Sequence, residues 1–225
     1  DCLLQLGVED FKIVLGHVGF FNGIVSALNL PPESAAAVRD AVDHKDSARL
    51  RKEIEASEIS PEKKRFIERL PDFAGGRDVL DAALSIVENA RSRDALNELV
   101  QIQATVDSLG LQDYIIFDLG EVRGLDYYTG IVLKIYGRSQ GFELGSGGRY
   151  DGLLGKFGWD LPAVGFSFTM DRVLPLVPEA GKLALPDCES EEYVVATEGS
   201  SPGEVFRQVW RLRRQGQRVH VGRRA

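Results

Sequence analysis

Apolar residues recur with two different periods along the chain, and the period changes near Gly110. From about residue 18 to residue 110 the spacing is that of helices. The clearest predicted helix spans residues 94–109, where the apolar stripe consists of Leu96, Leu99, Ile102, Val106 and Leu109. Ser92 is predicted as its N-cap and Gly110 as its C-terminal stop.

Shorter segments carry the pattern of strands. Phe11, Ile13 and Leu15 alternate with other residues and predict a strand with one apolar face. After Gly110, three runs rich in β-branched and aromatic residues predict further strands over 114–117, 131–136 and 164–168. Strands in direct succession favour an antiparallel sheet over a repeating βαβ series, so the expected fold class is α+β.

The last part of the chain has a different organisation. A break near residues 178–190 precedes a predicted strand (193–196), a helix (203–215) and a second strand (218–221), which together form one βαβ unit. One such unit cannot bury both faces of a parallel sheet. We therefore expect a second, smaller α/β domain from residue 190, truncated at residue 225. The chain also opens within an apolar periodic segment, which indicates a longer polypeptide.

Composition narrows the class of protein. Hydrophobic residues make up 44% and charged residues 27%, which is typical of a soluble globular protein. The sequence contains neither a bilayer-length apolar run nor a signal-peptide pattern, so we expect a cytoplasmic protein without a membrane partner. Cys2 and Cys188 stand alone and predict reduced thiols. Because the histidines are scattered as well, we expect no metal site: they are His17, His44 and His220.

Charge is distributed unevenly. The net charge is −7, but residues 207–225 contain seven arginines and no acidic residue, which leaves −14 for residues 1–206. This negative charge would repel the phosphate backbone of a nucleic acid, so we do not expect nucleic acid as a partner. The arginine-rich end is predicted to be the outer face of an amphipathic helix. An RNA-facing patch is the alternative.

The first of three blocks with candidate chemistry spans residues 123–130 (Arg-Gly-Leu-Asp-Tyr-Tyr-Thr-Gly). Adjacent tyrosines on a strand point to opposite faces, so one of Tyr127 and Tyr128 is expected to pack in the sheet while the other offers its hydroxyl group to a ligand. The guanidinium group of Arg123 suits a carboxylate or a phosphate. The alternative is a hairpin with an Arg123–Asp126 surface pair and two core aromatic rings.

The second block spans residues 145–152 (Gly-Ser-Gly-Gly-Arg-Tyr-Asp-Gly). Its glycines allow the backbone to approach a ligand closely, and Arg149 and Asp151 are placed to brace the following turn. A glycine-rich hairpin is the alternative. Neither a dinucleotide fingerprint nor a phosphate loop fits, because Phe157 stands where a phosphate loop has Ser or Thr.

The third block, residues 162–172, predicts a buried strand that runs into a short helix. Arg172 lies near this junction. It is placed either to reach a triphosphate or to pair with Asp171.

In this order the three blocks resemble the core of histidyl-tRNA synthetases and of ATP phosphoribosyltransferase regulatory subunits, most closely over residues 113–176. The resemblance implies a class II synthetase-like antiparallel sheet with helices. It implies a histidine-like pocket formed by Arg123, Asp126, Tyr127, Tyr128, Gly147, Gly148, Arg149 and Tyr150. Within it, Arg123 corresponds to the position at the carboxylate and Tyr128 to the position at the imidazole ring. A vestigial nucleotide site is implied at Gly165, Thr169 and Arg172.

Departures from the synthetase pattern favour the regulatory subunit. Thr169 replaces a glycine next to the nucleotide, and Lys134 ends a segment where synthetases commonly have glutamate. The front segment, residues 7–19, lacks the Asn and Arg that synthetases tend to have there. The helical stretch that includes residues 44–46 also resembles the regulatory subunit more closely.

The resemblance implies a domain plan and a function. Residues 1–186 would form a partial synthetase-like core, with a helical insertion at about 18–110 and a pocket sheet at about 111–176. The protein would be a non-catalytic subunit, without a cofactor, that activates short-form ATP phosphoribosyltransferase in the first step of histidine biosynthesis. Expected partners are the catalytic subunit, a second copy of itself within a hetero-oligomer, and histidine as the feedback effector.

Two alternatives remain. One is a histidyl-tRNA synthetase, which charges tRNA with histidine using ATP. The other is a truncated product without function, because the first two class II motifs are absent from these residues.

Overall fold

In the computed structural model, residues 1–55, 57, 59–121, 127–137, 141–178, 191–196 and 199–223 are described, with the backbone alone for 191–196 and 223. A six-stranded sheet in the order β2-β3-β1-β4-β5-β6 forms the centre, and β7 and β8 form a separate sheet. The strands are β1 (Phe11–His17), β2 (Ala74–Gly75), β3 (Ile115–Asp118), β4 (Ile131–Gly137), β5 (Glu143–Arg149), β6 (Val164–Phe168), β7 (Glu191–Ala196) and β8 (Arg218–Arg223).

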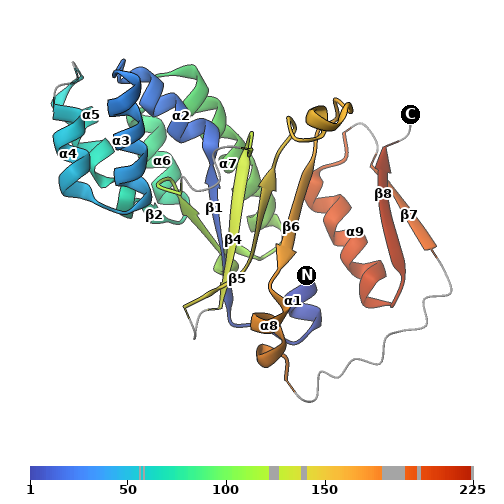
Figure 1. Ribbon diagram of the computed structural model, residues 1–225. Helices are drawn as coiled ribbons and strands as arrows, with labels where there is room; N and C mark the ends of the chain where they lie inside the picture. The colour runs from blue at the N-terminus through green and yellow to red at the C-terminus, as the bar shows by residue number, and fades with distance from the viewer. Residues whose placement is uncertain are drawn as a thin grey trace.

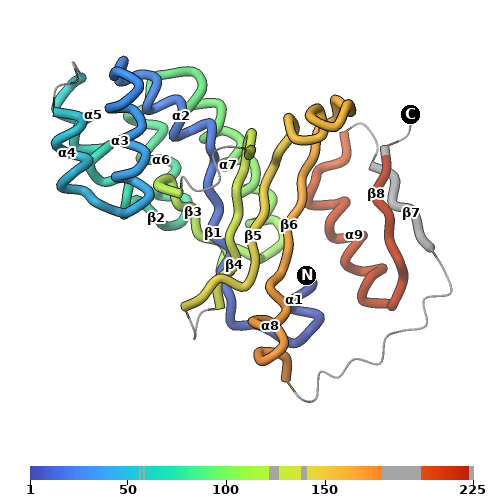
Figure 2. The backbone as a smooth tube through the Cα atoms, in the orientation of Figure 1, coloured from blue at the N-terminus to red at the C-terminus, as the bar shows by residue number. Residues whose placement is uncertain are grey.

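The helices gather mainly on one side of the large sheet. The α-helices are α1 (Cys2–Gln5), α2 (Val18–Ala27), α3 (Pro32–Asp43), α4 (Ser47–Glu55), α5 (Pro61–Arg69), α6 (Arg77–Ile86), α7 (Ala90–Ser108), α8 (Met170–Val173) and α9 (Pro202–Arg214). Short 3-10 turns are η1 (Leu70–Asp72), η2 (Gln112–Tyr114), η3 (Leu154–Phe157) and η4 (Leu174–Leu176). Helices α2 to α6 cluster beyond β1 and β2, while β7, α9 and β8 lie past β6 at the opposite side (Figure 1). The Cα trace in the same orientation shows these two groups of elements on opposite sides of the six-stranded sheet (Figure 2).

Neighbouring strands of the six-stranded sheet are antiparallel except for the pair β1 and β3. Strand β1 pairs antiparallel with all of β4, from Phe11 opposite Gly137 to His17 opposite Ile131. Strands β4, β5 and β6 continue antiparallel. Strand β1 is parallel to β3, however, with Ile13 opposite Ile115. The long helical segment between β1 and β3 provides the crossover that a parallel pair needs. The α+β prediction is thus confirmed, with a mixed sheet that is mostly antiparallel.

The central helix α7 begins earlier than predicted. Its N-cap is Asn89, whose side chain accepts a hydrogen bond from the Ser92 amide. Ser92 itself is fully buried, and its Oγ donates to the Phe20 carbonyl of α2 at 2.7 Å. The N-cap prediction for Ser92 is therefore wrong: this hydroxyl joins two packed helices. Gly110 adopts φ +69°, which is consistent with the predicted helix stop.

Strand β5 overlaps the glycine-rich block, for which the sequence offered a hairpin only as the alternative to a ligand-binding segment. Glycine has low strand propensity, so the period-2 signal is missing there. Tyr114, in contrast, was predicted in a strand but belongs to η2. Its ring stacks on Phe11, with 4.7 Å between the ring centroids.

Strand β6 forms where it was predicted, but the prediction that it is buried is wrong. Val164 is 76% exposed and Phe166 is 56% exposed. The reason is topological, since β6 is the edge strand of the six-stranded sheet in the described part of the chain.

The predicted C-terminal βαβ unit is present, with β7 parallel to β8. Helix α9 lies close to α7: a Cβ atom on Gly203 would be 2.4 Å from the Ser108 Oγ. Arg207 Nη1 donates to the Ser108 carbonyl at 3.0 Å, and Arg213 lies 3.6 Å from the Asp1 carboxylate. Part of the arginine-rich helix α9 thus contacts the negatively charged part of the chain, residues 1–206.

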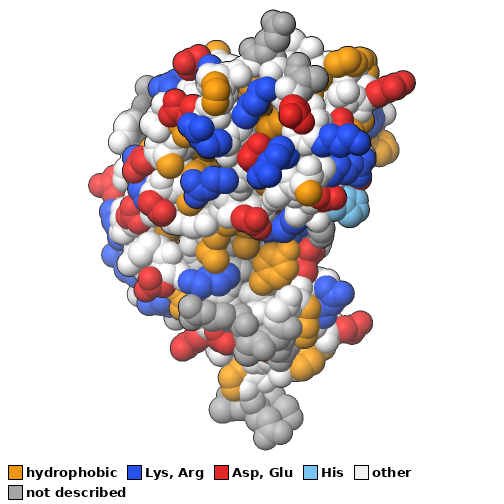
Figure 3. All heavy atoms as spheres, turned by 90° about the vertical axis from the view of Figure 1, so that its left-hand side faces the viewer, with side chains coloured by type: hydrophobic (Ala, Val, Ile, Leu, Met, Phe, Trp, Pro, Cys, Tyr) orange, Lys and Arg blue, Asp and Glu red, His pale blue; other side chains and the backbone are white. Residues whose placement is uncertain are grey.

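The surface of the helical cluster carries both signs of charge. Viewed from that side, Lys and Arg side chains lie among Asp and Glu side chains (Figure 3). Within the described residues, no helix combines the length and the hydropathy that a bilayer crossing needs.

Candidate functional site

A small cavity lies where β4 begins, beside the centre of β5. It has a volume of about 160 Å³ and is lined by Glu121, Tyr127, Tyr128, Val132, Leu133, Lys134, Ser146 and Gly147. Three predicted site residues therefore line one cavity: Tyr127, Tyr128 and Gly147. Arg123 and Asp126 lie outside the described residues.

The two tyrosines precede β4 and do not belong to a strand. The expectation that they point to opposite faces is wrong, because it required strand geometry. Their ring centroids are 4.2 Å apart and the planes are tilted by 38°. Tyr150 extends the group, with its ring centroid 6.4 Å from each of the other two. The result is an aromatic wall at the cavity.

The Tyr128 hydroxyl group is held in its protonated form. Burial is the main cause that raises its pKa, and the neighbouring Tyr127 hydroxyl adds to the effect. A protonated phenol can donate one hydrogen bond and accept others. Tyr128 thus lines the cavity as a neutral phenol.

The glycines of β5 and β6 make room for these rings. A Cβ atom on Gly148 would lie 2.8 Å from the Tyr128 ring, and one on Gly165 would lie 2.4 Å from the Tyr150 hydroxyl oxygen. A Cβ atom on Gly147 would lie 2.2 Å from the Gly165 carbonyl oxygen. Gly147 lines the cavity itself, whereas Gly148 and Gly165 act through the tyrosines that they allow to pack closely.

Arg149 and Asp151 brace the turn after β5, as the sequence predicted. Arg149 Nε donates to Asp151 Oδ2 at 2.7 Å, and Asp151 Oδ1 accepts from the Ala163 amide at 3.0 Å. The Thr129 amide donates to the Arg149 carbonyl at 2.7 Å. Arg149 lines a separate groove of about 820 Å³ between α7, α9 and the sheet, so its side chain does not line the small cavity.

A buried ion pair forms the floor of the cavity and was not predicted. Lys134 Nζ lies 2.7 Å from Glu121 Oε2, with the two side chains only 12% and 11% exposed. The pair also lines an adjoining cavity of about 240 Å³ that includes Lys45 and Asp118. Burial raises the pKa of Asp118, although its carboxylate accepts a hydrogen bond from the Gly120 amide at 2.8 Å. A lysine within the otherwise apolar strand β4 was the sequence signal for this pair.

The predicted vestigial nucleotide residues lie along β6 and α8, away from the cavity lining. Arg172 Nη1 donates to the Glu143 carbonyl at 2.7 Å, and its guanidinium carbon lies 5.9 Å from the Phe142 ring centroid. This contact differs from the predicted alternative of a pair with Asp171. Thr169 is the N-cap of α8 without a side-chain hydrogen bond.

A mostly antiparallel sheet interrupted by a helical insertion, with an aromatic and glycine-lined pocket on it, defines a class II synthetase-like core. A sequence profile for histidyl-tRNA synthetase matches residues 1–173. The chain belongs to the histidyl-tRNA synthetase family.

Within this family, the chain is similar to ATP phosphoribosyltransferase regulatory subunits. It is 42% identical to that of Syntrophotalea carbinolica over 176 residues, which cover 77% of this chain and 41% of the relative. It is 36% identical to that of Desulforamulus reducens over 220 residues, which cover 97% and 54%. A crystal structure described as an ATP phosphoribosyltransferase regulatory subunit/histidyl-tRNA synthetase from Bacillus halodurans superposes with a TM-score of 0.69 at 26% identity, covering 96% of this chain and 55% of that one. The chain thus spans about half the length of these relatives.

Proposed function

We propose that the chain is part of a non-catalytic regulatory subunit that activates short-form ATP phosphoribosyltransferase, in the first step of histidine biosynthesis. The observation that carries this proposal is the 36% identity over 97% of the chain to a protein of that name. The buried Lys134–Glu121 pair supports it, because Lys134 occupies a position where synthetases commonly have glutamate.

The cavity at Tyr127 and Tyr128 is the proposed histidine sensor. Its volume of about 160 Å³ suits a small amino acid. Tyr128 would contact the imidazole ring, and Arg123 with Asp126 would complete the site from the neighbouring segment. Histidine then regulates the enzyme only to the extent that it binds one arrangement of the complex more tightly than another.

The proposal that the subunit is non-catalytic depends on the residues that correspond to the nucleotide site of synthetases. These residues are Gly165, Thr169 and Arg172. Arg172 is already engaged with the Glu143 carbonyl, and Gly165 accommodates the Tyr150 hydroxyl. Thr169 adds a β-branched side chain where a nucleotide would approach. These contacts support the view that the nucleotide site is vestigial.

The remaining parts of the proposal concern organisation. Residues 1–186 would be a partial synthetase-like core and residues 190–225 the start of a second α/β domain. The partners would be the catalytic subunit and a second copy of the regulatory subunit, in the cytoplasm. The separate β7–β8 sheet supports the domain boundary.

Calorimetry of histidine binding to the full-length protein tests the sensor. We expect binding in the unmodified protein and a loss of at least about tenfold in Arg123→Ala, because a charge-assisted contact to the carboxylate disappears. The matched variant Arg65→Ala removes an exposed arginine of α5 and should bind normally. No binding by the unmodified protein, or equal affinity in Arg123→Ala, would refute the sensor.

A histidyl-tRNA synthetase is the second candidate, favoured by the profile match over residues 1–173. Histidine-dependent exchange of pyrophosphate with ATP distinguishes the two. We expect no exchange above background, and exchange at an enzymatic rate would establish the synthetase instead.

A further inference from the structure

A second cavity lies in the helical cluster, far along the chain from the tyrosine pocket. It has a volume of about 330 Å³ and opens between α2, α5 and the connection from α6 to α7. Its walls are mainly apolar side chains of the core: Ile24, Leu28, Phe66, Ile67 and Val87 are each at most 6% exposed. Ligand pockets are typically concave and apolar with a few polar groups, and this volume lies at the small end of their range.

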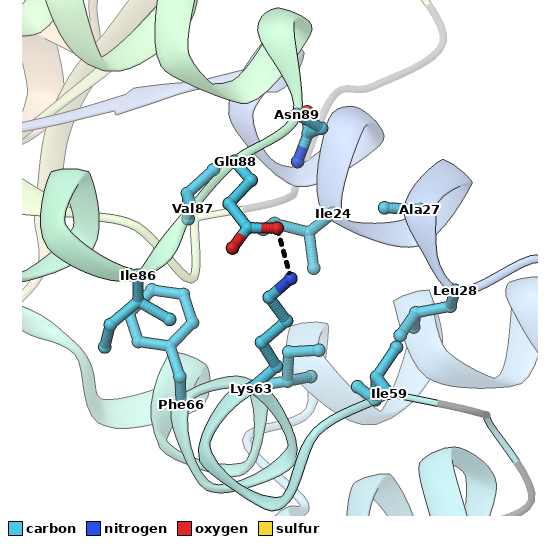
Figure 4. A pocket seen from close by; sticks show the side chains of 11 residues that line it. Ile24, Ala27, Leu28, Ile59, Lys63, Phe66, Ile86, Val87, Glu88 and Asn89 are labelled. Carbon is cyan, nitrogen blue, oxygen red and sulfur yellow. Dashed lines mark hydrogen bonds and ion pairs between the residues drawn. The ribbon is translucent and has the colours of Figure 1, made fainter.

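The polar groups of this cavity gather at its mouth. Lys63 Nζ donates to Glu88 Oε2 at 2.6 Å, and this ion pair crosses the opening in Figure 4. The amide nitrogen of Asn89 points toward the same space (Figure 4). Two donors, one of them a cation, thus face the cavity mouth. Among the lining residues in the described part of the chain, Glu88 is the one acidic side chain.

One of the two donors, Asn89, and one wall are already fixed in position. Asn89 Oδ1 accepts from the Ser92 amide at 2.8 Å, which orients the nitrogen of the same side chain. The Phe66 ring is held edge-on against Phe73, with 5.3 Å between the ring centroids. Binding of a ligand to these two side chains would therefore cost little of their conformational entropy.

The Lys63–Glu88 pair is weak enough to be replaced. The Glu88 side chain is 79% exposed and the Lys63 side chain 37% exposed. Ion pairs with such exposure contribute little net stability, because water and salt screen them. A competing carboxylate delivered by a bound apolar group can take the place of Glu88 on Lys63.

We propose that this cavity is a binding site for a small monocarboxylate with a compact apolar body. The body fills the space between Ile24, Phe66 and Val87. The carboxylate accepts hydrogen bonds from Lys63 Nζ and Asn89 Nδ2. The Glu88 side chain rotates away from Lys63 into the solvent. The site is independent of the proposed histidine sensor.

Titration with 4-phenylbutanoate tests this site, with the neutral 4-phenylbutanamide as the matched ligand. Binding to the full-length protein is followed by calorimetry and by the methyl NMR signals of Ile24 and Ile59, which line the cavity. We expect the acid to bind roughly tenfold more tightly than the amide, because the charged contact to Lys63 is made only by the acid. No binding of the acid, shifts that avoid these methyl groups, or equal affinity for acid and amide would each overturn the proposal.

Variants separate the charged contact from the apolar space. Lys63→Met should abolish the preference for the acid, whereas Lys52→Met at an exposed position of α4 should leave it unchanged. Glu88→Gln should strengthen acid binding about threefold by removing the competitor for Lys63. Ala27→Phe places a ring in the cavity from an exposed helix position and should prevent binding, while Ala36→Phe on α3 should not. An unchanged acid preference in Lys63→Met would contradict the assignment, and so would normal binding in a folded Ala27→Phe.

Discussion

Lys134 and Glu121 form a buried ion pair, with 2.7 Å between Nζ and Oε2, at the floor of the tyrosine-lined cavity. Lys134 lies in the middle of β4, and Glu121 follows the end of β3. Strand β1 lies between those two strands in the sheet. The pair therefore connects two parts of the sheet that are not hydrogen-bonded to each other.

Removing one partner of this pair should destabilise the fold. Lys134→Met leaves a carboxylate with little access to water, and we expect the free energy of unfolding to fall by about 2–3 kcal/mol. The double variant Lys134→Met/Glu121→Gln should regain most of the loss, because it also removes the buried negative charge. Chemical denaturation measures both, with exposed Lys156→Met as the control. Equal loss in the single and double variants would mean that the pair is not the cause.

Gly148 should be intolerant of a side chain. A Cβ atom there would lie 2.5 Å from the Ile131 carbonyl oxygen and 2.8 Å from the Tyr128 ring. We expect Gly148→Ala to lower the free energy of unfolding by about 1–3 kcal/mol and to displace Tyr128 from the cavity. Gly152→Ala is the matched control, since nothing lies within 4 Å of its added Cβ atom. Thermal unfolding and histidine titration of both variants check this, and an equally stable Gly148→Ala would disprove the close packing.

His17 should make stability depend on pH. Its Nδ1 accepts a hydrogen bond from the Gly19 amide at 3.0 Å, so that atom must be unprotonated. Burial lowers the pKa of His17 below its ordinary value of 6.5, and this effect outweighs the opposing hydrogen bond to Glu98. Arg149 and Arg91 lower it further.

The sign follows from linkage. The unfolded chain binds a proton at this histidine more readily than the folded chain, so the contribution of His17 is complete above pH 6.5 and is lost as pH falls from there toward the folded pKa. We expect the unmodified protein to lose stability on acidification by up to about 1.4 kcal/mol per pH unit more than His17→Asn, which can keep the cap without titrating. Denaturation between about pH 8 and pH 5 measures the difference. His44→Asn, at an exposed histidine, is the control, and parallel curves for the unmodified protein and His17→Asn would contradict this role.

Ser92 should stabilise the packing of α7 on α2. Ser92→Ala removes the hydrogen bond to the Phe20 carbonyl from a fully buried site, and we expect a loss of about 1 kcal/mol. Ser85→Ala removes a hydroxyl whose bond to the Ala82 carbonyl is exposed, and should change stability much less. Equal effects of the two substitutions in denaturation experiments would argue against a role for the interhelical bond.

Much of the fold followed from periodicity, and the exceptions have physical causes. The stripe that includes Leu96 and Leu99 predicted α7 because both side chains face the core. Ser92 was wrongly predicted as the N-cap of α7, because a serine near a helix N-terminus can serve either as an N-cap or as a buried hydrogen-bonding residue. Only the position of Phe20, distant in sequence, distinguishes the two. Strand β5 was predicted only through the hairpin alternative, because its pairing depends on neighbours on both sides and not on its own propensity.

The site was predictable in part. The three sequence blocks identified Tyr127, Tyr128 and Gly147, which line one cavity. They did not predict that the rings of Tyr127 and Tyr128 pack against each other, since this requires the chain to leave strand geometry before β4. Glu121 was missed because it is an ordinary surface residue by type, and only the fold brings it to Lys134.

Reconstitution with the short-form catalytic subunit of ATP phosphoribosyltransferase tests the central claim most directly. The measurement is the rate of phosphoribosyl transfer to ATP by the purified catalytic subunit, with and without the full-length regulatory protein and with and without histidine. We predict that the protein raises the rate by about tenfold or more and that histidine inhibits the complex. A Tyr128→Leu protein should still activate but should respond less to histidine. An unchanged rate on addition of the folded protein would contradict the account.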